Sequence, residues 1–192
     1  VRQAKSESAA RRNVAILFDD NRIKSEIASA HRKLQQRQIG NGAFPWFDGG
    51  RPDDYITLYI TTGYGRLRNM GVNLDMNLAF RAVNRLDDWM EERYHDILHR
   101  GHEDRNNLSH RIALYLYCRS FFLKDRPVPQ DHKEALDYFL NEANEHWLTL
   151  SRQGQGHVAL ALKRFKVHPE IPDKIVTSLR EFSVSEEEMG MF

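Results

Sequence analysis

Residues 41–55 read NGAFPWFDGGRPDDY, and the helical patterns of the rest of the chain are arranged around this segment. Glycine supplies positive φ angles and proline fixes φ, so the segment is predicted to be a shaped loop between two helices. We expect Trp46 and Phe47 to be buried in that turn, because burial of large rings is strongly stabilising. The alternative is an exposed binding platform. Its candidate residues are Phe44, Trp46, Phe47, Arg51, Asp54 and Tyr55.

Amphipathic helices are predicted on both sides of this loop. Before it, apolar residues recur every three or four positions from Arg22 to about Gln38. After it, Asp53 and Asp54 are expected to cap a helix and to occupy its first turn. Gly63 and Gly65 in that helix each cost about 1 kcal/mol relative to alanine, so we expect a neighbouring helix to approach closely there. The predicted inward face comprises Ile56, Tyr59, Ile60, Gly63, Tyr64 and Leu67.

The remaining sequence predicts further helices, beginning with one from Ser6 to about Phe18. The segment from Ile112 to Leu123 is apolar on most sides, which is typical of a centrally buried helix. A break is expected at Gly154 and Gly156. Inward faces are predicted for three more helices: Leu74, Leu78, Ala82, Leu86 and Trp89; Leu136, Phe139, Leu140, Ala143, Trp147 and Leu150; and Ile175, Leu179 and Phe182. Strand signals are nearly absent, so the fold class is all-α, built from antiparallel helical hairpins.

Composition sets limits on the classes of partner. The 192 residues suit one domain, and the net charge of +1 gives no sign of nucleic-acid binding. No apolar run approaches the length of a membrane span, and no signal-peptide pattern begins the chain. We therefore expect neither a nucleic-acid partner nor direct membrane insertion. Cys118 lies in an apolar run and is interpreted as a small buried hydrophobe.

Candidate catalytic and metal sites are weak throughout the sequence. His95 and His99 have ligand spacing, but the helix is expected to end near Gly101, and a solvated helix end is the favoured interpretation. Acidic doublets such as Asp87-Asp88 diverge by about 100° on a helix and rarely converge on one substrate atom. No catalytic motif is complete, so we predict no metal, no cofactor and no enzymatic activity in this chain.

A family resemblance covers most of the chain. The run from Leu34 to Leu67 resembles bacterial members of the alpha-2-macroglobulin family, in which a helix ending in Leu and Gln leads to a glycine-aromatic turn and a Tyr-Ile-Thr-like helix start. The tail from Ser185 to Phe192, SEEEMGMF, is similar to the segment that follows the helices of the thioester-type domain in that family.

This resemblance implies a partial or complete α/α toroid, a ring of helical hairpins that terpenoid cyclases and protein prenyltransferases also use. It also implies an exported bacterial protein of the periplasm or cell surface that inhibits or traps proteases. We expect residues 1–192 to be a single helical domain within a much larger multidomain protein, with target proteases, surface proteins and neighbouring domains as partners. The reactive Cys-x-Glu-Gln of the family is missing here, because Cys118 is followed by Arg119 and Ser120. A non-catalytic domain is therefore expected.

Two other classes of function stay open from the residues alone. One is an α/α-toroid enzyme that acts on a glycan or an isoprenoid. It would use the aromatic loop for stacking and acids such as Asp54 or Asp88 for catalysis. The other is a purely helical interaction module.

Overall fold

The computed structural model describes residues 20–183, 185–186 and 190–191 of the chain. By its contacts the chain divides into residues 1–38 and residues 39–192, and each unit is described by itself. In the first unit the structure describes one helix, α2 (Asp20–Arg37), where the sequence predicted one. The helix predicted from Ser6 to Phe18 lies outside the described residues. The expectation that residues 1–192 form a single domain stays a prediction.

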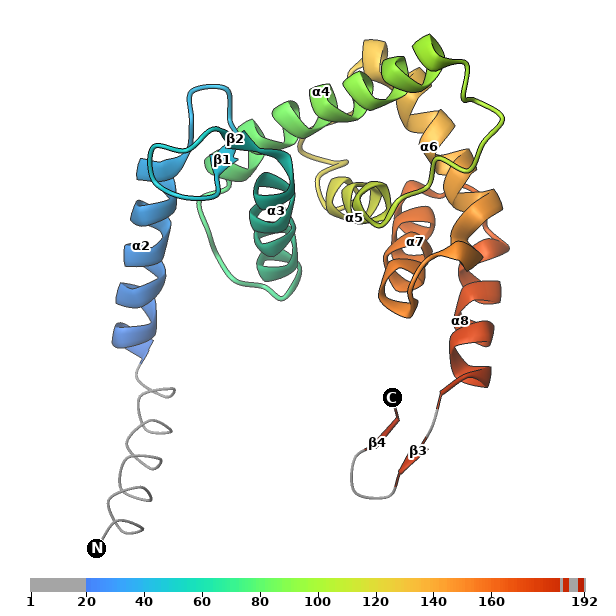
Figure 1. The fold of residues 1–192 in the computed structure, drawn as a ribbon. Helices are drawn as coiled ribbons and strands as arrows, with labels where there is room; N and C mark the ends of the chain where they lie inside the picture. The colour runs from blue at the N-terminus through green and yellow to red at the C-terminus, as the bar shows by residue number, and fades with distance from the viewer. Residues whose placement is uncertain (1–19, 184, 187–189, 192) are drawn as a thin grey trace, which may run out of the picture. The chain divides into compact units, whose positions relative to one another are not determined.

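The second unit is mainly helical, which confirms the all-α prediction (Figure 1). Two short antiparallel strand pairs, which the sequence did not predict, accompany the helices. Phe44 lies opposite Asp53 in the first pair, and Ser185 lies opposite Met191 in the second. The elements of this unit are β1 (Phe44–Pro45), β2 (Pro52–Asp53), α3 (Asp54–Asn69), α4 (Asn77–Arg100), α5 (His110–Arg119), η1 (Gln130–His132), α6 (Lys133–His146), η2 (Trp147–Thr149), α7 (Arg152–Phe165), α8 (Ile171–Glu181), β3 (Ser185–Glu186) and β4 (Gly190–Met191).

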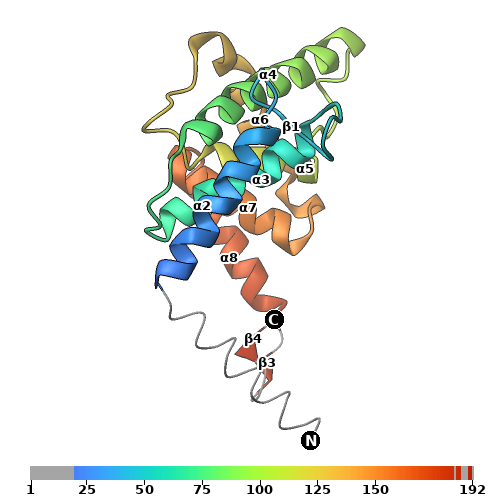
Figure 2. The same ribbon diagram turned by 90° about the vertical axis from the view of Figure 1, so that its left-hand side faces the viewer.

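Helix α5 is the central helix of this unit, as its apolar sequence predicts. It packs against α3, α4, α6 and α7, and α7 in turn packs against α8. Figure 1 shows α5 beside α7, and Figure 2 shows the same helices after a quarter turn. Ser109 begins α5 as its N-cap, because its Oγ accepts a hydrogen bond from the Ile112 amide at 3.2 Å. Cys118 is buried within α5, as predicted.

Helix α3 buries only part of the predicted face. Tyr64 is buried as predicted, but Tyr59 is 65% exposed and Leu67 is also exposed, so the assignment of these two to the inward face is wrong. The buried face carries three threonines, and all three hydroxyls donate to carbonyls one turn back: Thr57 to Asp53 at 2.7 Å, Thr61 to Thr57 at 2.6 Å and Thr62 to Leu58 at 2.7 Å. Because the helix itself satisfies these hydroxyls, the threonines can enter the core at low cost.

The glycines of α3 and α7 were expected to mark close helix packing and a helix break, respectively. A Cβ on Gly65 would lie 2.7 Å from the Phe121 ring, which confirms close packing there, although the neighbour is a ring in the turn after α5. A Cβ on Gly63 would meet no atom within 4 Å, so close approach at Gly63 is wrong. Gly154 and Gly156 lie inside α7, which makes the predicted break wrong as well. Ser151 caps that helix, and its Oγ accepts from the Gly154 amide at 3.3 Å.

The apolar faces of α4 and α6 agree with the sequence. Leu78, Ala82, Leu86 and Trp89 are buried in α4, and all six predicted positions from Leu136 to Leu150 are buried along α6 and η2. In α8, Ile175 is buried but Phe182, just after the helix, is exposed, against prediction. Helix α4 continues to Arg100, where Gly101 ends it in a left-handed conformation with φ of 62°.

Candidate functional site

The base of the aromatic loop is fixed to α3. Phe44 is only 1% exposed, and its amide donates to Thr57 Oγ1 at 2.8 Å. The same hydroxyl donates to the Asp53 carbonyl at 2.7 Å, next to the β1–β2 pairing. Gly42, with φ of +89°, lies so close to the Arg81 carbonyl that a Cβ would be 2.4 Å away. These contacts hold the two ends of the loop in one position.

The tip of the loop carries its other two rings outward. Trp46 is 66% exposed and Phe47 is 68% exposed, so the expectation that both are buried is wrong. The Gly50 amide donates to the Phe47 carbonyl at 2.9 Å, and Gly49 has φ of +75°, so the tip is a hydrogen-bonded turn. Phe44 takes the buried position at the loop base, and the turn displays Trp46 and Phe47 beside exposed Arg51.

Asp54 and Tyr55 belong to the first turn of α3 and not to the tip of the loop. Asp53 caps that helix, with Oδ1 accepting from the Ile56 amide at 2.8 Å, as predicted. Asp54 pairs with Arg85 Nη2 of α4 at 3.0 Å. Burial raises the pKa of Asp54, and the positive charge of Arg85 opposes that rise. The partly exposed Tyr55 ring lies 5.9 Å from the Arg111 guanidinium.

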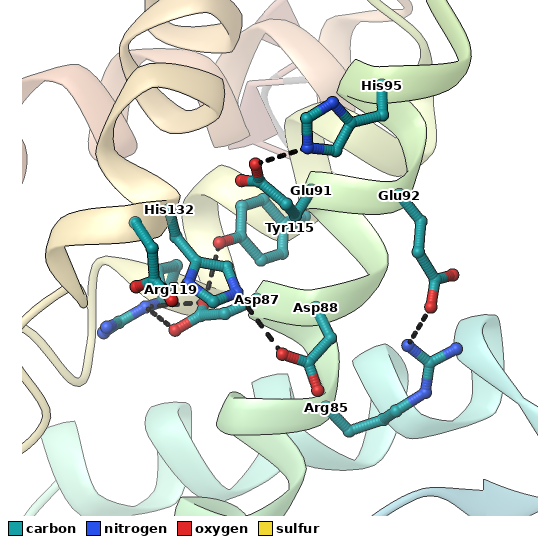
Figure 3. A network of polar contacts seen from close by, with 10 residues as sticks. Arg85, Asp87, Asp88, Glu91, Glu92, His95, Tyr115, Arg119 and His132 are labelled. Atoms are coloured by element: carbon teal, nitrogen blue, oxygen red, sulfur yellow. Dashed lines mark hydrogen bonds and ion pairs between the residues drawn. The ribbon is translucent and has the colours of Figure 1, made fainter.

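A buried polar cluster between α4 and α5 was missed by the sequence reasoning. Arg119 Nε lies 2.9 Å and 3.2 Å from the two carboxylate oxygens of Asp87, and the Tyr115 hydroxyl donates to Asp87 Oδ1 at 2.7 Å (Figure 3). All three side chains are buried. Burial raises the pKa of Asp87, while Arg119 and Tyr115 act against it. The spacing Val83, Asp87, Met90 on a buried helix face was the available signal.

A second, more exposed set of pairs runs along α4 beside this cluster. His132 of η1 lies 3.3 Å from Asp88 and 3.1 Å from Asp131 (Figure 3). Arg85 also pairs with Glu92 at 3.3 Å, and His95 with Glu91 at 3.0 Å. The two acids named for the alternative enzyme, Asp54 and Asp88, therefore both have basic partners.

Among the described residues, no three His, Cys, Asp or Glu side chains are grouped to hold a metal ion. None of the helices in that part of the chain combines the length and apolar character needed to cross a membrane. Comparison of the chain with models of known protein families and with curated proteins found no match in either.

Proposed function

We propose that this chain is a non-catalytic helical domain of a bacterial alpha-2-macroglobulin-like protein, and that its aromatic loop contacts a target protease. The proposal extends to an α/α toroid and to a periplasmic or cell-surface location. Its support comes from the resemblance of residues 34–67 and 185–192 to that family and from the helical pairs of residues 39–192.

The observation that carries the proposal is the outward display of Trp46 and Phe47 on an anchored loop. Aromatic side chains provide much of the binding energy in protein interfaces when they enter a pocket on the partner. Because Phe44 and Thr57 hold the base of the loop, its backbone loses little conformational entropy on binding. The loop is therefore suited to recognise a protein surface.

The test measures binding of active-site-blocked serine, cysteine and metalloproteases to the immobilised protein by biolayer interferometry. At least one protease should bind, and the double variant Trp46→Ala/Phe47→Ala should weaken it about tenfold or more. Leu148→Ala is the matched control, because Leu148 is 66% exposed on a different element, η2, and its loss should leave binding unchanged. The proposal fails if no protease binds, or if the double variant binds like the wild type.

One observation favours the alternative function, an enzyme that acts on a glycan or an isoprenoid. Exposed rings suit stacking on a sugar as well as contact with a protein, and Asp54, which follows the same loop, has a raised pKa. A glycan array would favour this second candidate if the wild type bound a defined glycan and the Trp46→Ala variant did not. Absence of any glycan signal would remove it.

A further inference from the structure

A cavity of about 330 Å³ lies among α3, α5 and the start of α7. It is separate from the tip of the aromatic loop. The residues that matter for its chemistry are Tyr55 from α3, His110, Arg111 and Leu114 from α5, and Ser151 and His157 at the start of α7. Among the described residues, no aspartate or glutamate lines it. The lining therefore combines basic and neutral polar groups with two apolar surfaces.

The exposed side chain of Arg111 lines this cavity and has no ion-pair partner in the described part of the chain. Its guanidinium lies 5.9 Å from the centre of the Tyr55 ring. Asp54 is near enough for Arg111 to act on its pKa, but that carboxylate is held by Arg85 at 3.0 Å. A guanidinium in this position can present paired N–H groups to an oxyanion while the ring supports its other face.

A second positive charge, that of the exposed Arg66, lies beside the buried lining residue His157. The His157 ring stacks on Tyr117, with centroids 4.7 Å apart, and Arg66 Nη2 lies 3.5 Å from His157 Nε2. Arg66 makes its other polar contact with the Tyr117 hydroxyl, at 3.4 Å, and not with a carboxylate. Burial and the charge of Arg66 lower the pKa of His157, so this imidazole is neutral near pH 7. An anion in the cavity would be attracted by the positive charge of Arg66, which lies beside the neutral His157 ring.

His110 supplies a donor with a defined tautomer. Its Nε2 accepts a hydrogen bond from the Ser151 amide at 3.0 Å. In the neutral ring the proton must then reside on Nδ1, which leaves that N–H as a donor.

The size of the cavity and its apolar surfaces indicate more than an inorganic ion. A cavity of about 150 Å³ is large enough to hold benzene, and this one has roughly twice that volume. Leu114 and the Tyr55 ring provide apolar contact beside the basic groups. We propose that this cavity binds a small organic oxyanion, with a carboxylate or phosphate at Arg111 and an apolar body against Leu114 and Tyr55.

Isothermal titration calorimetry on the whole protein tests this with four probes: benzoate, phenyl phosphate, inorganic phosphate and the neutral benzamide. Benzoate or phenyl phosphate should bind saturably, and about tenfold or more tighter than inorganic phosphate and benzamide. Whichever of the two binds more tightly identifies the preferred head group. The proposal fails if neither organic anion binds, or if benzamide or inorganic phosphate binds equally well.

Arg111→Gln should weaken binding of the organic anion about tenfold or more. The matched control is Arg100→Gln, which removes the same charge from the exposed end of α4, where Arg100 pairs with Asp96. It should bind like the wild type, and equal losses in both variants would mean general electrostatic attraction and overturn the site. Trp46→Ala/Phe47→Ala should leave this binding unchanged, so the outcome is independent of the protease proposal.

Discussion

The α4–α5 contact and the aromatic loop both depart from the usual pattern of buried apolar and exposed charged side chains, and they do so in opposite ways. Asp87 and Arg119, which are charged residue types, are buried, whereas Trp46 and Phe47 are exposed. The buried pair is held by specific hydrogen bonds, and the exposed rings are held by the backbone of a tight turn. In the first region the polar atoms define how two helices meet, and in the second the backbone defines what the surface presents.

The largest effect is expected from breaking the buried pair. Arg119→Ala leaves the Asp87 carboxylate buried without its cation and should lower the free energy of unfolding by about 3–5 kcal/mol. Urea denaturation monitored by circular dichroism measures it. Arg100→Gln, at an exposed pair with Asp96, should change stability by at most about 1 kcal/mol. Similar losses in both variants would contradict a special cost of burial.

The double variant Asp87→Leu/Arg119→Met distinguishes the cost of breaking the pair from the net contribution of the pair. Nη1 and Nη2 of Arg119 are buried and have no hydrogen-bond partner among the described residues, so the guanidinium keeps part of its desolvation cost. The double variant should therefore recover part of the stability lost in Arg119→Ala, and the rest stays lost because the buried Tyr115 hydroxyl no longer has Asp87 as its acceptor. No recovery would mean that the ion pair itself is strongly stabilising.

Within the loop, Phe44 should behave as a core residue although Trp46 and Phe47 do not. Phe44→Ala removes a fully buried ring and should cost about 3 kcal/mol, at the low end for such truncations because a loop can partly collapse into the space. Thermal and urea denaturation would detect it. A change below about 1 kcal/mol would show that the loop base is not anchored as described.

The two glycines of α3 compare a buried and an open face of one helix. Gly65→Ala forces a methyl group against the Phe121 ring and should cost about 1–3 kcal/mol. Gly63→Ala meets no neighbour and should stabilise the protein by up to about 1 kcal/mol through helix propensity. If both variants lost equal stability, the assignment of the two faces would be wrong.

His132, beside the buried cluster, should make a smaller contribution to folding stability that depends on pH. Burial acts against its charge, but hydrogen bonds to Asp131 and Asp88 and the nearby charge of Asp87 raise the pKa of His132 above 6.5. A raised folded-state pKa gives stability that is fully present below the unfolded pKa and is lost as pH rises through the folded value. The stability difference between wild type and His132→Asn should therefore shrink from pH 5.5 to pH 8.5, and a constant difference would rule out this titration.

The sequence predicted helix positions well because they depend on periodicity and caps. Asp53 caps its helix as predicted, and the apolar faces of α4 and α6 are buried. The face of α3 was mispredicted because Thr61 and Thr62 satisfy their hydroxyls within the helix, which a hydropathy pattern does not register. Gly154 was mistaken for a break because its role in packing depends on residues outside its helix, Leu150 and the distant His110.

The sequence identified the residues of the candidate loop but not which of their side chains are buried and which are exposed. The loop residues were identified, yet which rings are buried depends on the β1–β2 pairing and on the hydrogen bond from Phe44 to Thr57. The cavity at Arg111 could not be predicted, since Tyr55, Arg111 and His157 come together only through the packing of three helices. Sequence spacing is informative within an element, whereas these features arise between elements.

The smallest effect on stability is expected at the exposed tip of the aromatic loop. Trp46→Ala should change the free energy of unfolding by no more than about 0.5 kcal/mol, because most of the ring stays exposed in the folded protein. Fluorescence quenching by acrylamide gives a direct readout, since the other two tryptophans, Trp89 and Trp147, are buried. Trp46→Ala should abolish the strongly quenched component of the emission, while Leu148→Ala should retain it. If strong quenching persisted in Trp46→Ala, a buried tryptophan would have to be accessible, and the exposed ring of Trp46 would not account for the quenched emission.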